Sequence, residues 1–116
     1  MSKTIIAGCR NYQNYDHVRE VLTRWILMDE ITEIVSGGAH GVDYLGERFA
    51  TEFSIPVKRF PADWNKHGKS AGPIRNREMA EYADQLIAFW DGKSRGTKNM
   101  IETMQKMNKP FTVYEI

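Results

Sequence analysis

The sequence predicts an α/β fold in which helices cover both faces of a five-stranded parallel sheet. Short apolar runs rich in β-branched residues alternate along the whole chain with longer segments whose apolar residues recur at helical spacing. Strict alternation of this kind favours a parallel sheet with right-handed crossovers, because each helix returns the chain to the same end of the sheet.

The first half of the chain contributes two predicted strands and two predicted helices. An uninterrupted β-branched run at residues 3–7 predicts a buried strand, and Asp16 suits the N-cap of the helix that follows. We expect that helix to bury Val18, Val21, Leu22, Trp25, Ile26 and Met28. A second strand is predicted at residues 31–36, and a second helix begins at Val42 or Asp43. Its inner face is expected to carry Leu45, Phe49, Ala50 and Phe53.

The middle of the chain holds a third strand and the longest segment without a periodic pattern. Residues 55–60 predict the strand, and Pro56 favours an edge of the sheet because proline has no N–H group to donate to a neighbour. Residues 61–73 predict an irregular segment, and loops of that length in compact domains are often functional. A third helix is expected from about Ile74, with Met79, Ala80 and Ala83 facing inward.

The last third of the chain repeats the strand–helix–strand pattern. The apolar run at 86–90 predicts a buried strand, and we expect Trp90 at its end to lie in the core. A fourth helix begins near Lys98 and stops before Pro110, and a fifth strand follows at 111–114. Residues 1–116 therefore predict a single domain, a Rossmann-like three-layer αβα sandwich. On the last helix, we expect the side chains that pack inward to be Met100, Ile101, Met104 and Met107.

Composition limits the classes of function. The chain has 116 residues, 41% hydrophobic and 27% charged, as in an ordinary globular domain. Its formal net charge of +1 argues against overall attraction to nucleic acids or membranes, although residues 66–98 carry seven Lys or Arg against four acidic residues. Cys9 is the only cysteine, so no intramolecular disulfide is expected. We expect a cytoplasmic protein without a membrane partner, because no apolar run suits a signal peptide or a span.

Three glycine-rich turns supply most of the candidate binding residues. The turns at 8–12, 37–43 and 91–97 each follow a strand and precede a helix, so they are expected to converge at the carboxyl edge of the sheet. Close backbone approach at glycine, unpaired N–H groups and the positive end of a helix dipole favour a bound phosphate or carboxylate there. The candidates are Gly8, Arg10, Ser36, Gly37, Gly38, Ala39, Asp43, Asp91, Gly92, Ser94, Arg95, Gly96 and Thr97.

These residues also have purely structural interpretations. The glycines suit tight turns that need a positive φ, and Arg10 suits an ordinary surface arginine. Asp43 fits either the start of a helix or an acceptor for a ribose hydroxyl. Because the flanking elements are those of a phosphate-binding turn, we favour ligand binding for the turn that begins at Ser36.

The segment 62–73 mixes an aromatic residue with basic and small residues. Trp64 fits either a base-stacking residue or an anchor in the core, and taken alone it favours the anchor. Lys69 and Arg75 are candidate phosphate ligands. Asn76, at the start of the next helix, is expected to face the same cleft.

Catalytic and metal chemistry have weaker support. Asp91, Asp63 and His67 are the candidate acids or bases for a catalytic cleft. The three histidines lack a metal-ligand spacing, and a single cysteine adds no second thiolate, so no metal site is expected.

Three blocks, SGGAHGVD, FPADWNKHGKSAGPIRNREM and LIAFWDGKSRGT, resemble the YspA-type core domain of the SLOG superfamily. That superfamily groups Rossmann-like domains of the Smf/DprA DNA-processing proteins with the LOG phosphoribohydrolases, which act on nucleoside monophosphates. The resemblance extends from Ile5 to about Val113, and members occur in bacteria and their phages. It implies the strand order 3-2-1-4-5 and a nucleotide-type ligand at the reversal between the first and fourth strands.

The resemblance also bears on catalysis. LOG hydrolases carry a Gly-Thr turn that Gly96-Thr97 matches, and they place a catalytic Glu three residues after the threonine. This chain has Met100 there, and Glu102 lies two residues further on. Because a methionine does not stabilise positive charge on a sugar, the departure predicts binding without turnover.

We therefore expect a binding domain for a nucleotide or nucleotide derivative, with no cofactor. Two alternatives stay open: a LOG-like hydrolase of N-glycosidic bonds in the same cleft, and DprA-like binding of single-stranded DNA. The near-zero net charge makes nucleic acid the less favoured partner. A homodimer is expected only as the usual default.

Overall fold

The computed structural model describes residues 2–28 and 30–116 and contains a five-stranded parallel sheet. The sheet has the order β3-β2-β1-β4-β5, and β1 pairs in parallel with both β2 and β4. The strands are β1 (Ser2–Gly8), β2 (Ile31–Ser36), β3 (Val57–Arg59), β4 (Gln85–Trp90) and β5 (Phe111–Glu115). The predicted fold class and strand order are thus confirmed, with the reversal of strand order between β1 and β4.

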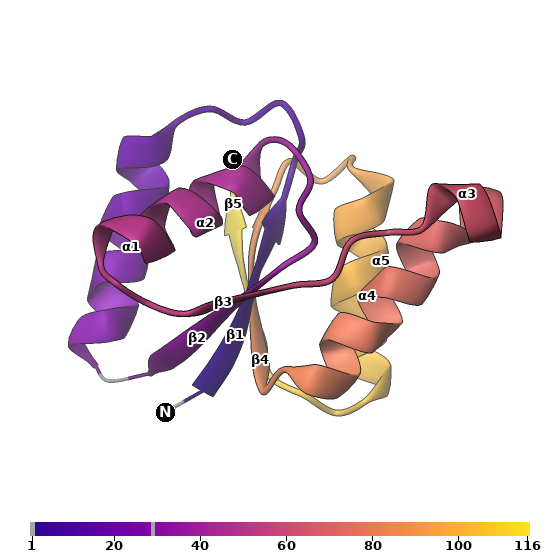
Figure 1. Cartoon of the computed structure of the whole chain (residues 1–116). Helices are drawn as coiled ribbons and strands as arrows, with labels where there is room; N and C mark the ends of the chain where they lie inside the picture. The colour runs from indigo at the N-terminus through magenta and orange to yellow at the C-terminus, as the bar shows by residue number, and fades with distance from the viewer. Residues whose placement is uncertain (1, 29) are drawn as a thin grey trace.

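Helices cover both faces of the sheet (Figure 1). Helices α1 (Tyr15–Leu27) and α2 (Val42–Glu52) lie on one face, and α4 (Ala71–Tyr82) and α5 (Arg95–Lys106) lie on the other. A one-turn helix, α3 (Trp64–His67), and a 3-10 turn, η1 (Gly68–Ser70), lead into α4. Helix α3 lies beyond the end of α4, at the periphery of the molecule.

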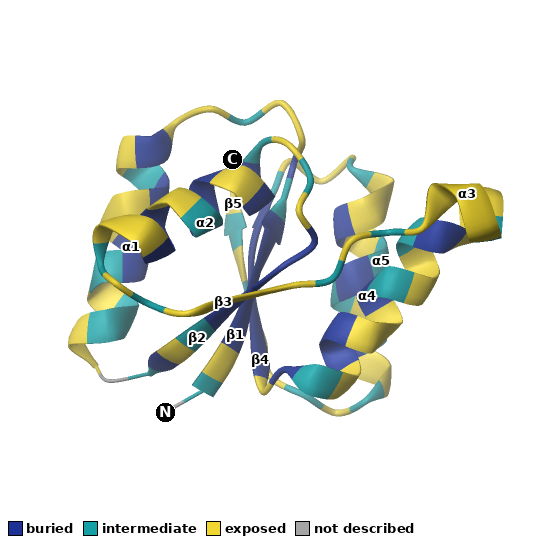
Figure 2. Ribbon diagram, in the orientation of Figure 1, coloured by how far each residue is buried: buried dark blue, intermediate teal, exposed yellow. Residues whose placement is uncertain are grey.

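The core consists of two apolar layers separated by the sheet, as the burial colours of Figure 2 show. Neighbouring residues of β1 serve opposite layers because side chains alternate along a strand: Ile6 packs with the α1–α2 layer, and Ile5 packs with the α4–α5 layer. The inward faces predicted for the helices are largely confirmed, with Leu22, Phe49 and Met104 almost fully buried.

The structure corrects two features of the first helix. Asn14, not Asp16, is the N-cap, and its side chain accepts a hydrogen bond from the backbone N–H of His17 at 3.1 Å. Met28 is 63% exposed instead of buried, because the helix ends at Leu27 and Met28 forms its C-cap.

The prediction that residues 61–73 are irregular is wrong. Helix α3 and the 3-10 turn occupy its centre, which adds a fifth α-helix, and α4 begins at Ala71 rather than near Ile74. Pro73 fits the first turn of α4, because N–H groups there have no partner within the helix. Strand β3 is shorter than predicted, but it does lie at an edge of the sheet, paired with β2.

Two tryptophans differ from their predicted environments. Trp64 is 51% exposed, so the interpretation of it as a core anchor is wrong. Trp90 is half-buried, because its indole N–H reaches outward to donate to the carbonyl of Ser94 at 3.1 Å.

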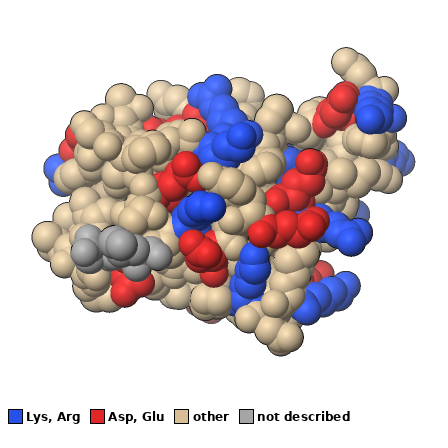
Figure 3. Space-filling view, turned by 60° about the horizontal axis from the view of Figure 1, so that its bottom comes forward, with Lys and Arg blue, Asp and Glu red and all other residues tan. Residues whose placement is uncertain are grey.

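The surface carries both signs of charge. In Figure 3, where the bottom of Figure 1 comes forward, basic and acidic side chains are interspersed rather than segregated. Within residues 2–28 and 30–116, no helix has the length and apolar character needed to cross a membrane. The face shown in Figure 3 therefore carries no broad basic patch.

Candidate functional site

The turns that follow β1, β2 and β4 meet at the carboxyl edge of the sheet. The backbone N–H of Cys9 donates to the carbonyl of Phe89 at 3.3 Å, and the N–H of Val42 donates to the carbonyl of Cys9 at 3.1 Å. Two glycines permit this approach: a Cβ on Gly8 would lie 2.3 Å from the Phe89 oxygen, and one on Gly41 would lie 2.2 Å from the Cys9 oxygen. The absence of a side chain at Gly8 and Gly41 therefore allows the backbones of the three turns to pack against one another.

A cleft of about 510 Å³ opens among these turns, where the strand order reverses. That volume lies within the usual range for small-molecule sites. Eleven of the predicted residues line it: Gly8, Arg10, Ala39, Asp43, Arg75, Asn76, Asp91, Ser94, Arg95, Gly96 and Thr97. The sequence prediction missed five residues that also line the cleft: Ala7, Cys9, Asn11, Met79 and Met100. Asn11 follows Arg10 directly in the same turn, which is the one signal that pointed to it.

A second cavity of about 350 Å³ adjoins the cleft. Arg10, Ala39 and Arg75 line both spaces, so the two spaces are neighbours at these residues. Gly37, Gly38 and Trp64 line the second cavity and not the cleft.

Other candidates lie elsewhere. Ser36 is buried, and its hydroxyl donates to Glu47 Oε2 at 2.6 Å. Gly92 and Lys69 line neither space. Asp63 and His67 also line neither, and Asp63 instead caps α3 by accepting from the N–H of Lys66 at 3.1 Å.

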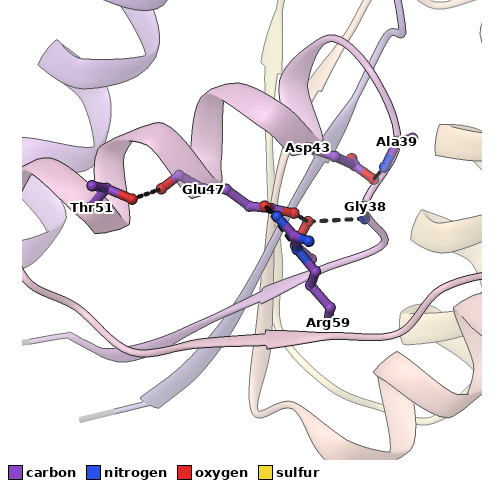
Figure 4. Close-up of polar contacts among 7 residues, drawn as sticks. Gly38, Ala39, Asp43, Glu47, Thr51 and Arg59 are labelled. Atoms are coloured by element: carbon purple, nitrogen blue, oxygen red, sulfur yellow. Dashed lines mark hydrogen bonds and ion pairs between the residues drawn. The ribbon is translucent and has the colours of Figure 1, made fainter.

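The turn after β2 satisfies two of its own N–H groups. The N–H of Gly38 donates to Ser36 Oγ at 3.0 Å, and the N–H of Ala39 donates to Asp43 Oδ2 at 3.3 Å. Figure 4 shows Asp43 reaching from the start of α2 back to Ala39. These donors are occupied within the protein, so this turn differs from the open phosphate cradle predicted at Gly37 and Gly38.

Arg75 bridges the turn after β2 and the start of α4. Its Nη1 donates to the carbonyl of Gly37 at 2.7 Å, and its Nε donates to Asn76 Oδ1 at 3.0 Å. A Cβ on Gly37 would lie 2.5 Å from Arg75 Nη1 and 2.9 Å from Asp43 Oδ2. The missing side chain at Gly37 thus leaves room for the Arg75 and Asp43 side chains, both of which lie on the wall of the cleft.

Burial shifts both members of that pair toward their neutral forms. Asp43 is 7% exposed, and burial raises its pKa to about 6, although the Ala39 N–H and the positive charges of Arg75 and Arg10 oppose the rise. Burial likewise lowers the pKa of Arg75, opposed by the charge of Asp43. The cleft therefore has a wall whose carboxyl group has a pKa of about 6.

Asp91 organises the turn after β4. Its Oδ1 accepts hydrogen bonds from the N–H groups of Lys93 at 2.8 Å and Ser94 at 2.9 Å. The hydrogen bonds from the N–H groups of Ser94 and Lys93 hold the pKa of Asp91 below its usual value, so the side chain is a carboxylate at neutral pH. A carboxyl group whose pKa lies below its usual value is poorly suited to act as a general acid at neutral pH.

The N-terminus of α5 opens into the cleft without a side-chain cap. Ser94 is its N-cap, but the Ser94 hydroxyl lies 3.1 Å from the hydroxyl of Thr97 and caps no backbone N–H. Among the described residues, the N–H groups of Arg95, Gly96 and Thr97 have no backbone or side-chain acceptor. Asn76 fixes this end of α5 by donating to the carbonyl of Gly96 at 3.3 Å.

Two arginines add charge to the same space. Arg10 and Arg95 are exposed and line the cleft. Across residues 2–28 and 30–116, neither forms an ion pair or a side-chain hydrogen bond. Their guanidinium groups are therefore free to contact a ligand. No group of three or more His, Cys, Asp or Glu side chains in the described part of the chain is arranged to hold a metal ion.

Solved structures share this fold. DNA processing protein A (DprA) from Streptococcus pneumoniae superposes with a TM-score of 0.79 at 17% identity, over 97% of this chain and 50% of that chain. DprA from Helicobacter pylori, described with a single-stranded DNA binding mode, superposes with a TM-score of 0.62 at 20% identity, over 96% of this chain and 64% of that chain. The chain thus spans about half to two thirds of these proteins, and the likeness shows the fold.

Sequence comparison identifies the family. The chain is 33% identical over 122 residues to the Gene 61 protein of Mycobacterium phage D29, covering 95% of this chain and 94% of that protein. Residues 2–67 match the model of the YspA, cpYpsA-related SLOG family, which confirms the predicted family; the match covers the first sequence block and the start of the second. With more than half of its residues matched and a relative aligned over nearly its full length, the chain belongs to the YspA, cpYpsA-related SLOG family.

Proposed function

We propose that this domain binds a nucleotide or nucleotide derivative through a phosphate group in the cleft between the β1 and β4 turns. The observation that carries the proposal is the convergence of the uncapped N-terminus of α5 with the unpaired guanidinium groups of Arg10 and Arg95 on one cavity. The free N–H groups, the positive end of the helix dipole and the two guanidinium groups, each able to donate two parallel hydrogen bonds, all favour a bound phosphate.

The opposite wall suits the sugar of such a ligand. Asp43 offers a carboxyl oxygen on the cleft, and Arg75 holds the turn beside it. Because the pKa of Asp43 is about 6, its carboxylate predominates at neutral pH and accepts hydrogen bonds from ribose hydroxyl groups. With the phosphate at the N-terminus of α5 and the sugar beside Asp43, the base of the ligand would extend out of the cleft.

The cleft favours binding without hydrolysis. Cleavage of an N-glycosidic bond develops positive charge on the sugar, which a nearby carboxylate must stabilise. At the position three residues after Thr97, the buried Met100 lines the cleft, and Glu102 is exposed and does not line it. Asp91 is the remaining acidic candidate on the β4 side, and it is already engaged by two N–H groups.

Two arginine variants test the proposal. Arg95→Ala removes a charged donor from the cleft, and Arg77→Ala removes the same charge from the outer face of α4, where Arg77 is paired with Glu81 at 3.7 Å. We expect nucleoside 5′-monophosphates to stabilise the wild type in thermal-shift assays, by about 2.7 kcal/mol at 100 times the Kd. Arg95→Ala is expected to weaken binding by about ten- to a hundredfold, as for the loss of a charge-assisted hydrogen bond.

The Arg77→Ala control shows whether a loss of affinity in Arg95→Ala is specific to the cleft. Arg77→Ala is expected to bind nucleotides as the wild type does, because Arg77 does not line the cleft. If both variants lose affinity equally, attraction is general rather than local, and the cleft is not the site. Absence of stabilisation by every nucleotide at millimolar concentration contradicts nucleotide binding itself.

Single-stranded DNA is a second candidate ligand. The observation that favours it is the shared fold with DprA, of which the Helicobacter pylori protein is described with a single-stranded DNA binding mode. A strand-binding protein gains affinity with every added nucleotide and loses it steeply with salt. Oligonucleotides of increasing length therefore distinguish this candidate from a small ligand.

A further inference from the structure

We propose that the ligand of the cleft contains two nucleoside units joined through phosphate, and that Trp64 stacks on the second base in the adjoining cavity. The inference rests on the proposed function, since the first unit occupies the cleft. It adds a second subsite and narrows the ligand to a dinucleotide.

The two spaces adjoin at the residues where the linking phosphate would lie. Arg10 and Arg75 line both the cleft and the cavity of about 350 Å³. Arg10 is exposed and, within the described chain, has no ion pair, so its charge is available at the junction. A ligand that continues from the cleft into the cavity passes these two arginines, and a bridging phosphate is the group that they favour.

Trp64 is held in a defined position although its ring is 51% exposed. It is the first residue of α3, and the Asp63 side chain caps that turn. Its ring packs beside Gly72, where an added Cβ would lie 3.4 Å from Trp64 Cη2. A fixed aromatic ring with a large exposed surface is suited to stack on a base, and every base offers such a face.

The other tryptophans serve the fold, which sets Trp64 apart. The indole N–H of Trp25 donates to the hydroxyl of Tyr114 at 3.0 Å, and that of Trp90 donates to the carbonyl of Ser94 at 3.1 Å. Both of these residues are half-buried. Trp64 lines the second cavity, whereas Trp25 and Trp90 line neither that cavity nor the cleft.

The rest of the cavity leaves room for a base. Gly38 lies on its wall with no atom within 4 Å of the position of a Cβ, so the backbone presents no side chain to the incoming ring. Arg59 also lines the cavity, but its Nε donates to Glu47 Oε1 at 2.9 Å, so its guanidinium group already has a carboxylate partner. The cavity thus combines an aromatic face, an open backbone and cations at its entrance.

The test compares ligands that differ by one nucleotide. Binding of a nucleoside 5′-monophosphate, a 5′-phosphorylated dinucleotide and a tetranucleotide of the same base is measured by calorimetry, for each of the four bases. The dinucleotide is expected to bind about ten- to a hundredfold more tightly than the monophosphate. This is the gain in affinity expected when one base stacks on an aromatic ring. The dinucleotide is also expected to quench tryptophan fluorescence, whereas the monophosphate leaves the Trp64 signal unchanged.

Substitutions of tryptophan test whether the extra affinity of the dinucleotide comes from Trp64. Trp64→Ala is expected to lose the gain of the dinucleotide and to keep the affinity for the monophosphate, whereas Trp64→Phe retains most of the gain. Trp25→Phe, which changes a tryptophan remote from both spaces, is expected to keep both the affinity and the quenching. Circular dichroism checks that each variant is folded.

The outcomes separate the inference from the proposed function. Equal affinity for monophosphate and dinucleotide, or a gain that survives in Trp64→Ala, overturns the second subsite and leaves the cleft standing. A further large gain for the tetranucleotide also overturns it, in favour of strand binding. If neither the monophosphate nor the dinucleotide binds, the proposed function fails, and the inference fails with it.

Discussion

The close packing of the three turns predicts that one added methyl group destabilises the whole fold. In Gly8→Ala the new Cβ would lie 2.3 Å from the carbonyl oxygen of Phe89, and 2.7 Å from Cγ2 of Val42. Phe89 and Val42 are fully buried, and Gly8 is paired with Phe89 in the sheet register, so neither neighbour moves freely. The methyl group must therefore push β1 and β4 apart at the carboxyl edge.

The size of the effect follows from the nature of the contact. Overpacking a dense core costs about 1–3 kcal/mol, and a backbone oxygen in a paired strand relieves less of the overlap than a flexible side chain. We expect a loss of about 3 kcal/mol in the free energy of unfolding. For a domain of this size, that loss lowers the Tm by roughly 10 °C.

Gly96→Ala is the matched control, since it adds the same group at the rim of the same cleft. No atom lies within 4 Å of the Cβ position at Gly96, which is in the first turn of α5. Because alanine favours a helix over glycine by up to about 1 kcal/mol, this variant is expected to be as stable as the wild type or slightly more stable. Urea denaturation followed by far-UV circular dichroism measures both. A change of less than about 0.5 kcal/mol for Gly8→Ala refutes the packing of the turns described above.

The remaining predictions concern the two acidic residues of the cleft. Burial raises the folded-state pKa of Asp43 from 3.8 to about 6, so its stabilising contribution is complete below pH 3.8 and is lost as the pH rises through 6. The stability of the wild type relative to Asp43→Asn should therefore fall by about 2 kcal/mol between pH 4 and pH 7 in urea denaturation, and a difference that stays constant with pH contradicts the raised pKa. We also expect no base release from any nucleoside 5′-monophosphate in a chromatographic assay. Robust release abolished by Asp91→Asn would make Asp91 a catalytic carboxylate, and release unaffected by that change would leave an enzyme with another catalytic residue.

Much of the fold was predictable because local patterns and topology agree. The β-branched runs and the helical spacing identified every strand, and parallel topology brings the turns after Gly8, Ser36 and Trp90 to one edge whatever the details of their side chains. The exact boundaries were harder. Asn14 and Asp16 both suit an N-cap, and only the backbone geometry decides between them.

The environment of individual side chains was less predictable. The N–H groups of Gly38 and Ala39 looked free in the sequence, and their partners became visible only when Ser36 and Asp43 were placed in space. Trp64 is a single aromatic residue in a polar segment, with no periodicity to show whether it faces the core. Pro73 was a usable signal that was missed, since proline is favoured in the first turn of a helix.

The most direct test of the central claim is the response of backbone amide resonances to a nucleoside 5′-monophosphate. We predict that the amides of Arg95, Gly96 and Thr97 shift most in an NMR titration, because these donors lack acceptors among the described residues and would bind the phosphate. Arg95→Ala should reduce the affinity measured in the same titration. The largest shifts appearing instead on α1 or β5, with residues 95–97 unchanged, would contradict the assignment of the cleft as the nucleotide site.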